Sequence, residues 1–133
     1  MTKDELRGQM RRMRRALSEE AQRETAETVF ARIAALDAYR SARVVMAYAA
    51  ARGELRLDAV LRDALAAGKT LALPRCAQAG VMHAYRVETL GQLRRGAYGI
   101  WEPIETCPRV EPETLDLILV PGTAFDICGH RLG

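Results

Sequence analysis

Two apolar stretches decide the fold: Arg43-Val44-Val45-Met46-Ala47-Tyr48-Ala49 and Thr70-Leu71-Ala72-Leu73-Pro74. Each is short and nearly continuous, as expected for a strand that is covered on both faces. Between them, residues 58–67 carry apolar side chains at helical spacing, and Gly68 is placed to end that helix. A strand, a helix and a second strand within this length form a βαβ unit. We therefore predict an α/β protein, with the second strand ended by its proline.

Helices are expected before this unit and further strands after it. Apolar residues recur at steps of four, three and four over residues 6–17, which predicts an amphipathic helix. Ser18 can cap a second helix that would extend to about Leu36. Residues 81–87 and 115–120 are apolar enough to form strands. Two helices would thus precede a mostly parallel sheet.

The composition is that of one ordinary globular domain. The chain has 133 residues, of which 49% are hydrophobic and 28% are charged. No internal repeat or low-complexity linker divides it. We predict that residues 1–133 form one three-layer α/β/α domain with a mostly parallel sheet, preceded by the two helices.

The positive charge is concentrated at the amino-terminal end. Lys and Arg exceed Asp and Glu by 20 to 17, and residues 1–15 hold six basic against two acidic residues. A nucleic-acid-binding domain usually spreads basic side chains over a broad face, so a nucleic-acid partner is not expected, although the basic first helix keeps that alternative open. No apolar run is long enough to cross a membrane, and because Arg and Glu recur through residue 24 we expect no secretory signal. The three cysteines form no C-x-x-C pair, so we expect free thiols, no zinc site and a cytoplasmic protein.

Four polar segments follow the predicted strands or lie in the loops near them: residues 50–54, 74–75, 98–103 and 121–133. Ligands of open parallel sheets gather at the carboxyl ends of the strands. Taken alone, a segment of this kind is more often an ordinary turn than a ligand site. The glycines near Arg131 could bring N–H groups and a guanidinium against phosphate oxygens, but their spacing matches no standard phosphate-binding loop.

Several short motifs together resemble one enzyme family. They are Lys3-x-x-Leu6-Arg7, Leu17-Ser18-x-Glu20, Gly53-Glu54, Gly68-Lys69, Leu73-Pro74-Arg75, Gly99-Ile100-x-Glu102-Pro103 and Asp116-Leu117-Ile118-x-Val120-Pro121-Gly122-x-Ala124-Phe125-Asp126-x-x-Gly129-x-Arg131-Leu132-Gly133. Their order and spacing resemble those of 5-formyltetrahydrofolate cyclo-ligases, also called methenyltetrahydrofolate synthetases. The resemblance extends from residue 3 to the end of the sequence.

The resemblance implies a ligase of folate one-carbon metabolism that depends on ATP and Mg²⁺. Such an enzyme converts 5-formyltetrahydrofolate to 5,10-methenyltetrahydrofolate and releases ADP and phosphate. ATP phosphorylates the formyl oxygen, N10 of the folate then adds to the formyl carbon, and phosphate departs. The protein would position the reactants and stabilise charge rather than form a covalent intermediate. The expected partner is the small-molecule substrate, and a full-length relative is expected to be a monomer.

The resemblance also assigns site residues. The ATP-binding residues would be Lys3, Arg7, Arg131, Leu132 and Gly133. The substrate-binding residues would be Arg7, Ala49, Glu54 and Tyr98. Lys3 and Arg7 are four residues apart and so share one helix face, and a carboxylate such as that of Glu54 can accept two hydrogen bonds from the pterin ring. Trp101 could stack on the folate or only cover its loop. No residue is assigned as a catalytic group or as a metal ligand.

The sequence departs from the family pattern after Arg131-Leu132-Gly133. Relatives continue into a G-x-G-Y-Y-D segment, whose N–H groups cradle phosphates and whose aspartate helps to hold Mg²⁺. That segment does not follow Gly133 in this chain. The expectation is therefore a form truncated at its carboxyl end, and the alternative function is a catalytically impaired module that binds folate or nucleotide.

Overall fold

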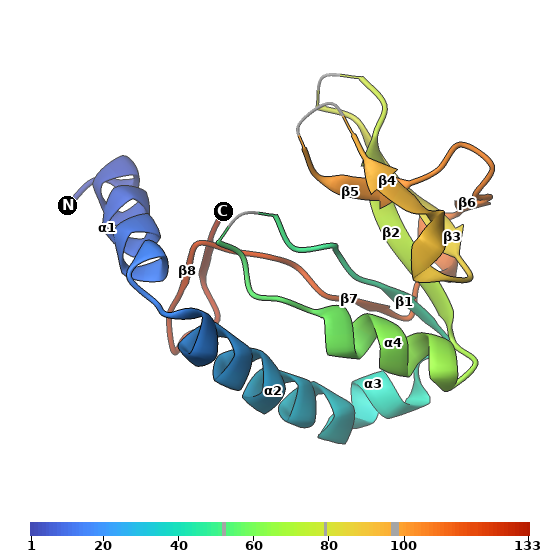
Figure 1. Ribbon diagram of the computed structural model, residues 1–133, viewed down its shortest axis with the longest axis horizontal. Coiled ribbons are helices and arrows are strands. Elements are labelled where there is room, and N and C mark those ends of the chain that lie inside the picture. Colours follow the sequence, from blue (N-terminus) through green and yellow to red (C-terminus); the bar gives the residue numbers. More distant parts are fainter. Residues whose placement is uncertain (52, 79, 97–98) are drawn as a thin grey trace.

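The structure is a computed structural model that describes residues 1–51, 53–78, 80–96 and 99–133 (Figure 1). Its helices are α1 (Lys3–Arg15), α2 (Glu19–Ala35), α3 (Asp37–Ser41) and α4 (Asp58–Ala66), with short 3-10 turns η1 (Leu90–Gln92) and η2 (Pro112–Thr114). Its strands are β1 (Val44–Met46), β2 (Thr70–Cys76), β3 (Met82–Val87), β4 (Leu93–Arg95), β5 (Trp101–Pro103), β6 (Arg109–Val110), β7 (Leu117–Ile118), β8 (Ala124–Phe125) and β9 (Arg131–Leu132). The helices and strands predicted from the sequence occur in the predicted order, whereas α3, β4, β5, β6, β8 and β9 were not predicted.

A five-stranded sheet with the order β6-β3-β2-β1-β7 forms the centre of the molecule. Strand β1 is parallel to both of its neighbours, with Val45 opposite Leu71 of β2 and Leu117 of β7. Strands β3 and β6 extend the sheet with antiparallel pairing. The segment β1-α4-β2 is the predicted βαβ unit, which confirms the α/β class.

The main core lies between this sheet and three helices. Figure 1 shows α2, α3 and α4 gathered along one side of the sheet. Buried side chains from both layers form the cluster: Tyr39, Val60, Leu61 and Ala64 from the helices, and Val45, Leu71, Leu73 and Val87 from the strands. A smaller cluster of Ala72, Ala84 and Val110 includes no residue of α1–α4. Within the described ranges, the helices of the core therefore cover one face of the sheet.

Local sequence features explain where most elements begin and end. The Ser18 hydroxyl accepts a hydrogen bond from the Ala21 N–H and caps α2, as predicted. Gly68 ends α4 with a φ of +76°, a conformation that favours glycine. The prediction that Pro74 ends β2 is wrong, because the strand continues to Cys76. Its pairing with β1 stops at Ala72, so the missing N–H of Pro74 interrupts no ladder there.

Helix α1 stands apart from the core. It contains no buried residue, and Thr2 and Glu5 form a reciprocal capping box at its amino end. Figure 1 shows α1 on the same side of the molecule as the carboxyl-terminal residues. Two polar contacts, from Arg7 to Gly133 and from Arg14 to Gly122, join this first helix to the carboxyl-terminal segment.

Candidate functional site

The segments that follow β1 and β7 leave the sheet side by side, at the carboxyl ends of these two strands. The two strands are parallel, and the hydrogen bond from the Leu119 N–H to the Met46 carbonyl continues their pairing to the strand ends. The first segment carries Ala49 and Glu54, and the second leads to the β8-β9 hairpin. Two of the four segments predicted from the sequence are therefore neighbours in space.

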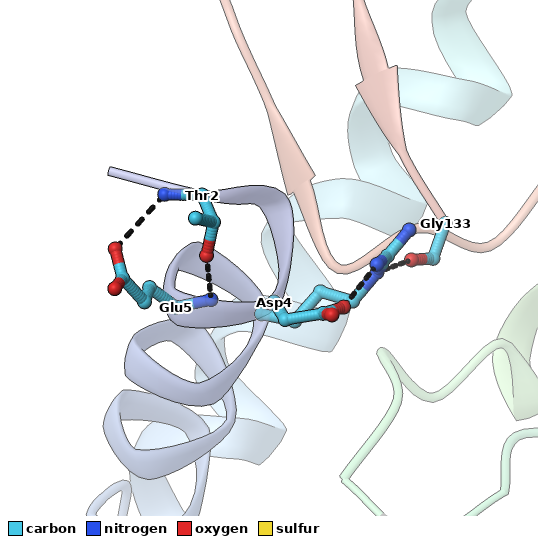
Figure 2. A network of polar contacts seen from close by, with 5 residues as sticks. Thr2, Asp4, Glu5 and Gly133 are labelled. Carbon is cyan, nitrogen blue, oxygen red and sulfur yellow. Dashed lines mark hydrogen bonds and ion pairs between the residues drawn. The ribbon is translucent and has the colours of Figure 1, made fainter.

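Arg7 joins the first helix to the last residue of the chain. Its Nη1 lies 2.7 Å from Oδ1 of Asp4, and its Nε donates to the main-chain oxygen of Gly133 at 2.9 Å. Figure 2 shows Asp4 and Gly133 on either side of this contact, each joined to it by a dashed line, near the Thr2–Glu5 cap. The structure thus brings together two residues of the predicted ATP group that are 126 positions apart. Lys3 lies exposed at the first residue of α1.

The β8-β9 hairpin carries the other predicted ATP-binding residues. Leu132 pairs with Ala124, and Arg131 pairs with Phe125. The Arg131 Nε donates to the Pro121 carbonyl at 2.7 Å, so this guanidinium braces the entry to its own hairpin. Arg131 and Leu132 are thus held next to Gly133, on the side of the molecule where α1 lies.

Asp126 organises the turn of the hairpin. Its Oδ1 accepts hydrogen bonds from the N–H groups of Cys128 and His130, both at 2.9 Å, and its Oδ2 lies 2.8 Å from Nδ1 of His130. The hydrogen bonds from the main chain and ring of His130 hold the pKa of the Asp126 carboxyl below its ordinary value. One carboxylate therefore fixes the shape of the loop before Arg131.

Glu54 lies in a tight turn after β1. Its Oε1 accepts a hydrogen bond from the Ala51 N–H at 2.8 Å, and the preceding Gly53 has a φ of +80°. Glu54 also lines a cavity of about 160 Å³ together with Arg14 and Leu17 of the first helix region. The carboxylate keeps further acceptor positions that a ligand could use.

Two charged side chains near this turn affect the pKa of the Tyr48 phenol. Its hydroxyl donates to the Leu55 carbonyl at 3.1 Å. Burial raises the pKa of the Tyr48 phenol, the Glu54 carboxylate raises it further, and Arg14 lowers it. A negative and a positive side chain therefore both act on the same half-buried phenol.

Ala49 and Trp101 line a second cavity, of about 240 Å³. Arg56 and Asp58 contribute its polar wall, and Leu61 contributes part of its apolar wall. Trp101 is 45% exposed, and the guanidinium carbon of Arg95 lies 5.5 Å from its ring centroid. Tyr98, the remaining predicted substrate residue, lies outside the described residues.

Sequence reasoning missed Arg14. Its Nη2 donates to the Gly122 carbonyl, at the start of the segment that forms the hairpin. Arg14 follows Arg7 by seven residues, about two helical turns, so both side chains leave the same face of α1. That spacing is the sequence feature that could have identified it, since Arg7 also contacts the hairpin.

The described part of the chain offers no ready metal centre. Within it, no group of three or more His, Cys, Asp or Glu side chains could hold a metal ion. Cys76, Cys107 and Cys128 are free thiols. None of the helices within the described ranges combines the length and the apolar character that a membrane span requires.

These features define an α/β protein whose candidate ligand site lies where the loops after parallel strands meet an amino-terminal helix. The chain belongs to the 5-formyltetrahydrofolate cyclo-ligase family, whose profile matches residues 1–133. The family relation that the sequence motifs indicated is thereby confirmed, and it places the chain in a family of enzymes.

Two curated relatives agree with this relation. A 5-formyltetrahydrofolate cyclo-ligase of Mus musculus is 28% identical over 135 residues, covering 96% of this chain and 66% of the relative. A probable 5-formyltetrahydrofolate cyclo-ligase of Caenorhabditis elegans is 32% identical over 145 residues, covering 98% of this chain and 67% of the relative. The chain therefore spans about two thirds of the length of the curated relatives that it matches.

Solved structures show the same fold. The 5,10-methenyltetrahydrofolate synthetase of Aquifex aeolicus superimposes with a TM-score of 0.88 at 38% identity, over 100% of this chain and 67% of that one. A 5,10-methenyltetrahydrofolate synthetase of Mycoplasma pneumoniae gives a TM-score of 0.75 at 19% identity, over 100% of this chain and 71% of that one. At that identity, the second likeness concerns the fold alone.

Proposed function

We propose that this chain carries the folate site and part of the nucleotide site of a 5-formyltetrahydrofolate cyclo-ligase. The observation that carries the proposal is the link between two loops at one edge of the sheet. Arg14 lines a cavity with Glu54 and contacts Gly122, while Arg7 contacts Gly133. A folate-binding loop and a nucleotide-binding hairpin would thus be held together by one helix.

The reaction requires ATP because the formamide carbon of the substrate is a poor electrophile. The formyl oxygen attacks the γ-phosphorus of ATP, ADP leaves, and the oxygen becomes part of a good leaving group. N10 of the folate then forms a bond to the activated carbon and loses its proton to solvent. Phosphate departs with the former formyl oxygen, which leaves 5,10-methenyltetrahydrofolate. Such chemistry needs the two reactants to be held in line and in contact.

The side chains divide between these two reactants. Glu54 would accept hydrogen bonds from the amino and ring N–H groups of the pterin. Ala49 would form part of an apolar wall, and Tyr98 would stack against the folate. Lys3, Arg7 and Arg131 would neutralise the phosphates of ATP, next to the N–H groups of Leu132 and Gly133. Arg7 would have to exchange the Asp4 carboxylate or the Gly133 oxygen for phosphate oxygens.

Mg²⁺ enters this proposal only as the ion that accompanies ATP. Among the described residues, no group of three or more His, Cys, Asp or Glu side chains is placed to hold it. Mg²⁺ commonly keeps several waters and binds substrate phosphates rather than a cage of protein oxygens. We therefore assign no residue of this chain to the metal and no step of the reaction to a protein-bound ion.

The test is a turnover assay with purified chain, 5-formyltetrahydrofolate, ATP and Mg²⁺, in which the absorbance of the methenyl product and the release of ADP are followed together. We expect both products in equal amounts, and loss of both with Arg7→Ala. Substrate binding without turnover would support the alternative, a module that binds folate or nucleotide without completing the reaction. A wild-type chain that binds neither substrate would refute both proposals.

A further inference from the structure

A second hollow lies beside the Glu54 cavity, between α1 and the loop after β1. It has a volume of about 200 Å³, and Arg11, Arg14, Arg15 and Gly53 line it. The three arginines are three and four positions apart, so they lie on one face of α1. No acidic side chain within the described ranges lines this hollow. We call it the arginine pocket.

The arginine pocket retains unused positive charge. Arg11 and Arg15 are exposed and take part in no ion pair or side-chain hydrogen bond among the described residues. Arg14 uses one donor on the Gly122 carbonyl, and a guanidinium has five N–H donors in all. Three guanidinium groups around one hollow favour a ligand with more than one anionic oxygen.

The arginine pocket adjoins the Glu54 cavity. Arg14 and Gly53 line both hollows, which have volumes of about 160 and 200 Å³. Each is smaller than the roughly 300–1,000 Å³ typical of sites for small organic ligands. A ligand that filled both would therefore place one end against a carboxylate and its other end among arginines.

We infer that the arginine pocket binds the carboxylates of the glutamate tail of the folate substrate. This inference rests on the proposed function, because it extends the ligand held at Glu54. The pterin end has N–H donors that match the Glu54 carboxylate, whereas the tail has an α- and a γ-carboxylate that match guanidinium groups. Arg14 and Arg56 also line the Glu54 cavity, but Glu54 is the one acidic side chain that lines either hollow within the described ranges. The position of this carboxylate thus sets the end at which the pterin lies.

Nucleotide phosphate is the other anion that arginines could hold. The proposed phosphate ligands lie elsewhere: Lys3 is at the first residue of α1, and Arg7 is bound to Gly133. Arg14 lines the Glu54 cavity and donates to the Gly122 carbonyl, whereas Arg7 contacts Gly133. The arginine pocket therefore lies at the carboxyl-terminal half of α1, beside the folate loop, and the proposed phosphate ligands of α1 lie at its amino-terminal half.

The test compares two folates that differ only in the tail. Equilibrium binding of 5-formyltetrahydrofolate and of 5-formyltetrahydropteroate, which lacks the glutamate, is measured by calorimetry without ATP. The chains are wild type, Arg11→Gln/Arg15→Gln and the control Arg12→Gln. Arg12 has the same charge, is also exposed on α1 and does not line the arginine pocket. Melting curves of all three chains establish that the variants are folded.

Wild type and the Arg12→Gln control should bind the glutamate-bearing folate about tenfold more tightly than the pteroate, as expected for partly exposed carboxylate–guanidinium contacts. The double variant should lose most of that ratio while its affinity for the pteroate stays unchanged. Equal affinities of the wild type for both folates would overturn the inference and leave the proposed function intact. ATP binding by the same three chains is measured in a separate titration, and a double variant that weakens ATP binding but keeps the wild-type ratio for the two folates would also overturn the inference. Failure of the wild type to bind either folate would overturn the proposed function itself, and the inference with it.

Discussion

Replacing Lys69 with methionine should destabilise the chain far more than replacing its only other lysine. Lys69 lies just before β2, about thirty residues after α3 in the sequence. Its side chain binds main-chain oxygens at the carboxyl end of α3. Its Nζ donates to the main-chain oxygens of Tyr39, Arg40 and Ala42 at 2.8, 3.3 and 2.6 Å. Lys69→Met keeps an unbranched side chain that is one atom shorter and removes the ammonium group, and with it all three hydrogen bonds.

The expected cost follows from these contacts. A hydrogen bond from a charged donor contributes about 1.5–3 kcal/mol when it is well shielded from water. Lys69 is half-buried and its three bonds share one ammonium group, so they do not add fully. The ammonium also lies 4.9 Å from the centroid of the Tyr39 ring, a contact that the methionine would lose. We expect a loss of about 2–3 kcal/mol in the free energy of unfolding.

Urea denaturation followed by circular dichroism measures this loss, and the melting temperature should fall by roughly 10 °C for a domain of this size. Lys3→Met is the matched control, because Lys3 is exposed at the start of α1. Its free energy of unfolding should change by less than about 0.5 kcal/mol. Equal effects of the two substitutions would refute the view that Lys69 holds α3 in place.

Three further predictions concern single polar contacts. Asp116 accepts hydrogen bonds from two N–H groups at the start of β1, and these bonds lower the pKa of its carboxyl. The ionised carboxylate therefore contributes its full stability above pH 4 or so, and this stability is lost as the pH falls through the lowered pKa. The difference in melting temperature between wild type and Asp116→Ala should therefore be largest at pH 7 and shrink towards pH 3, and a difference that grew on acidification would contradict this. Tyr39→Phe removes the 2.6 Å hydrogen bond to Asp63 from a buried residue and should cost about 1–2 kcal/mol in urea denaturation, whereas an unchanged midpoint would show that the bond contributes nothing. Asp126→Ala should speed hydrogen exchange of the N–H groups in the β8-β9 turn at least several-fold and leave exchange in α4 unchanged; equal exchange in the turn of both proteins would mean that another group shapes it.

The parts of the fold that could be predicted from the sequence are those specified by nearby residues. The apolar runs of β1 and β2, the helical spacing of α4 and the glycine at its end all lie within one continuous stretch. Ser18 likewise marks the boundary between α1 and α2 through a local contact, because its hydroxyl caps α2 by binding the N–H group only three residues ahead. Such features need no knowledge of the rest of the chain.

Other parts depend on residues that are distant in sequence. Helix α3 is a single turn of five residues, and Lys69 holds its end from another part of the chain. Strand β7 was expected over six residues, but only Leu117 and Ile118 pair with β1. The hairpins β4-β5 and β8-β9 were missed because their strands are two or three residues long. A pattern this short cannot be distinguished from an ordinary loop.

The candidate site shows the same division. Motif resemblance placed Arg7 and Gly133 in one group of residues, and the structure adds the contact between them. Arg14 carries no family motif in the sequence, and its role follows only from its position beside Gly122 and the Glu54 cavity. All assignments of residues to particular ligands stay predictions: Lys3, Arg7, Arg131, Leu132 and Gly133 for ATP, and Arg7, Ala49, Glu54 and Tyr98 for the substrate.

The central claim is that the loop after β1 binds the pterin of a folate through Glu54. The most direct measurement is the affinity of 5-formyltetrahydrofolate for wild type and for Glu54→Gln, with Glu113→Gln, which changes an exposed carboxylate on η2, as the control. Glutamine keeps the shape of the side chain and replaces one acceptor oxygen with a donor. If Glu54 binds the pterin, Glu54→Gln should weaken binding by about tenfold or more, and the control should bind like wild type. Equal affinities of wild type and Glu54→Gln would contradict it.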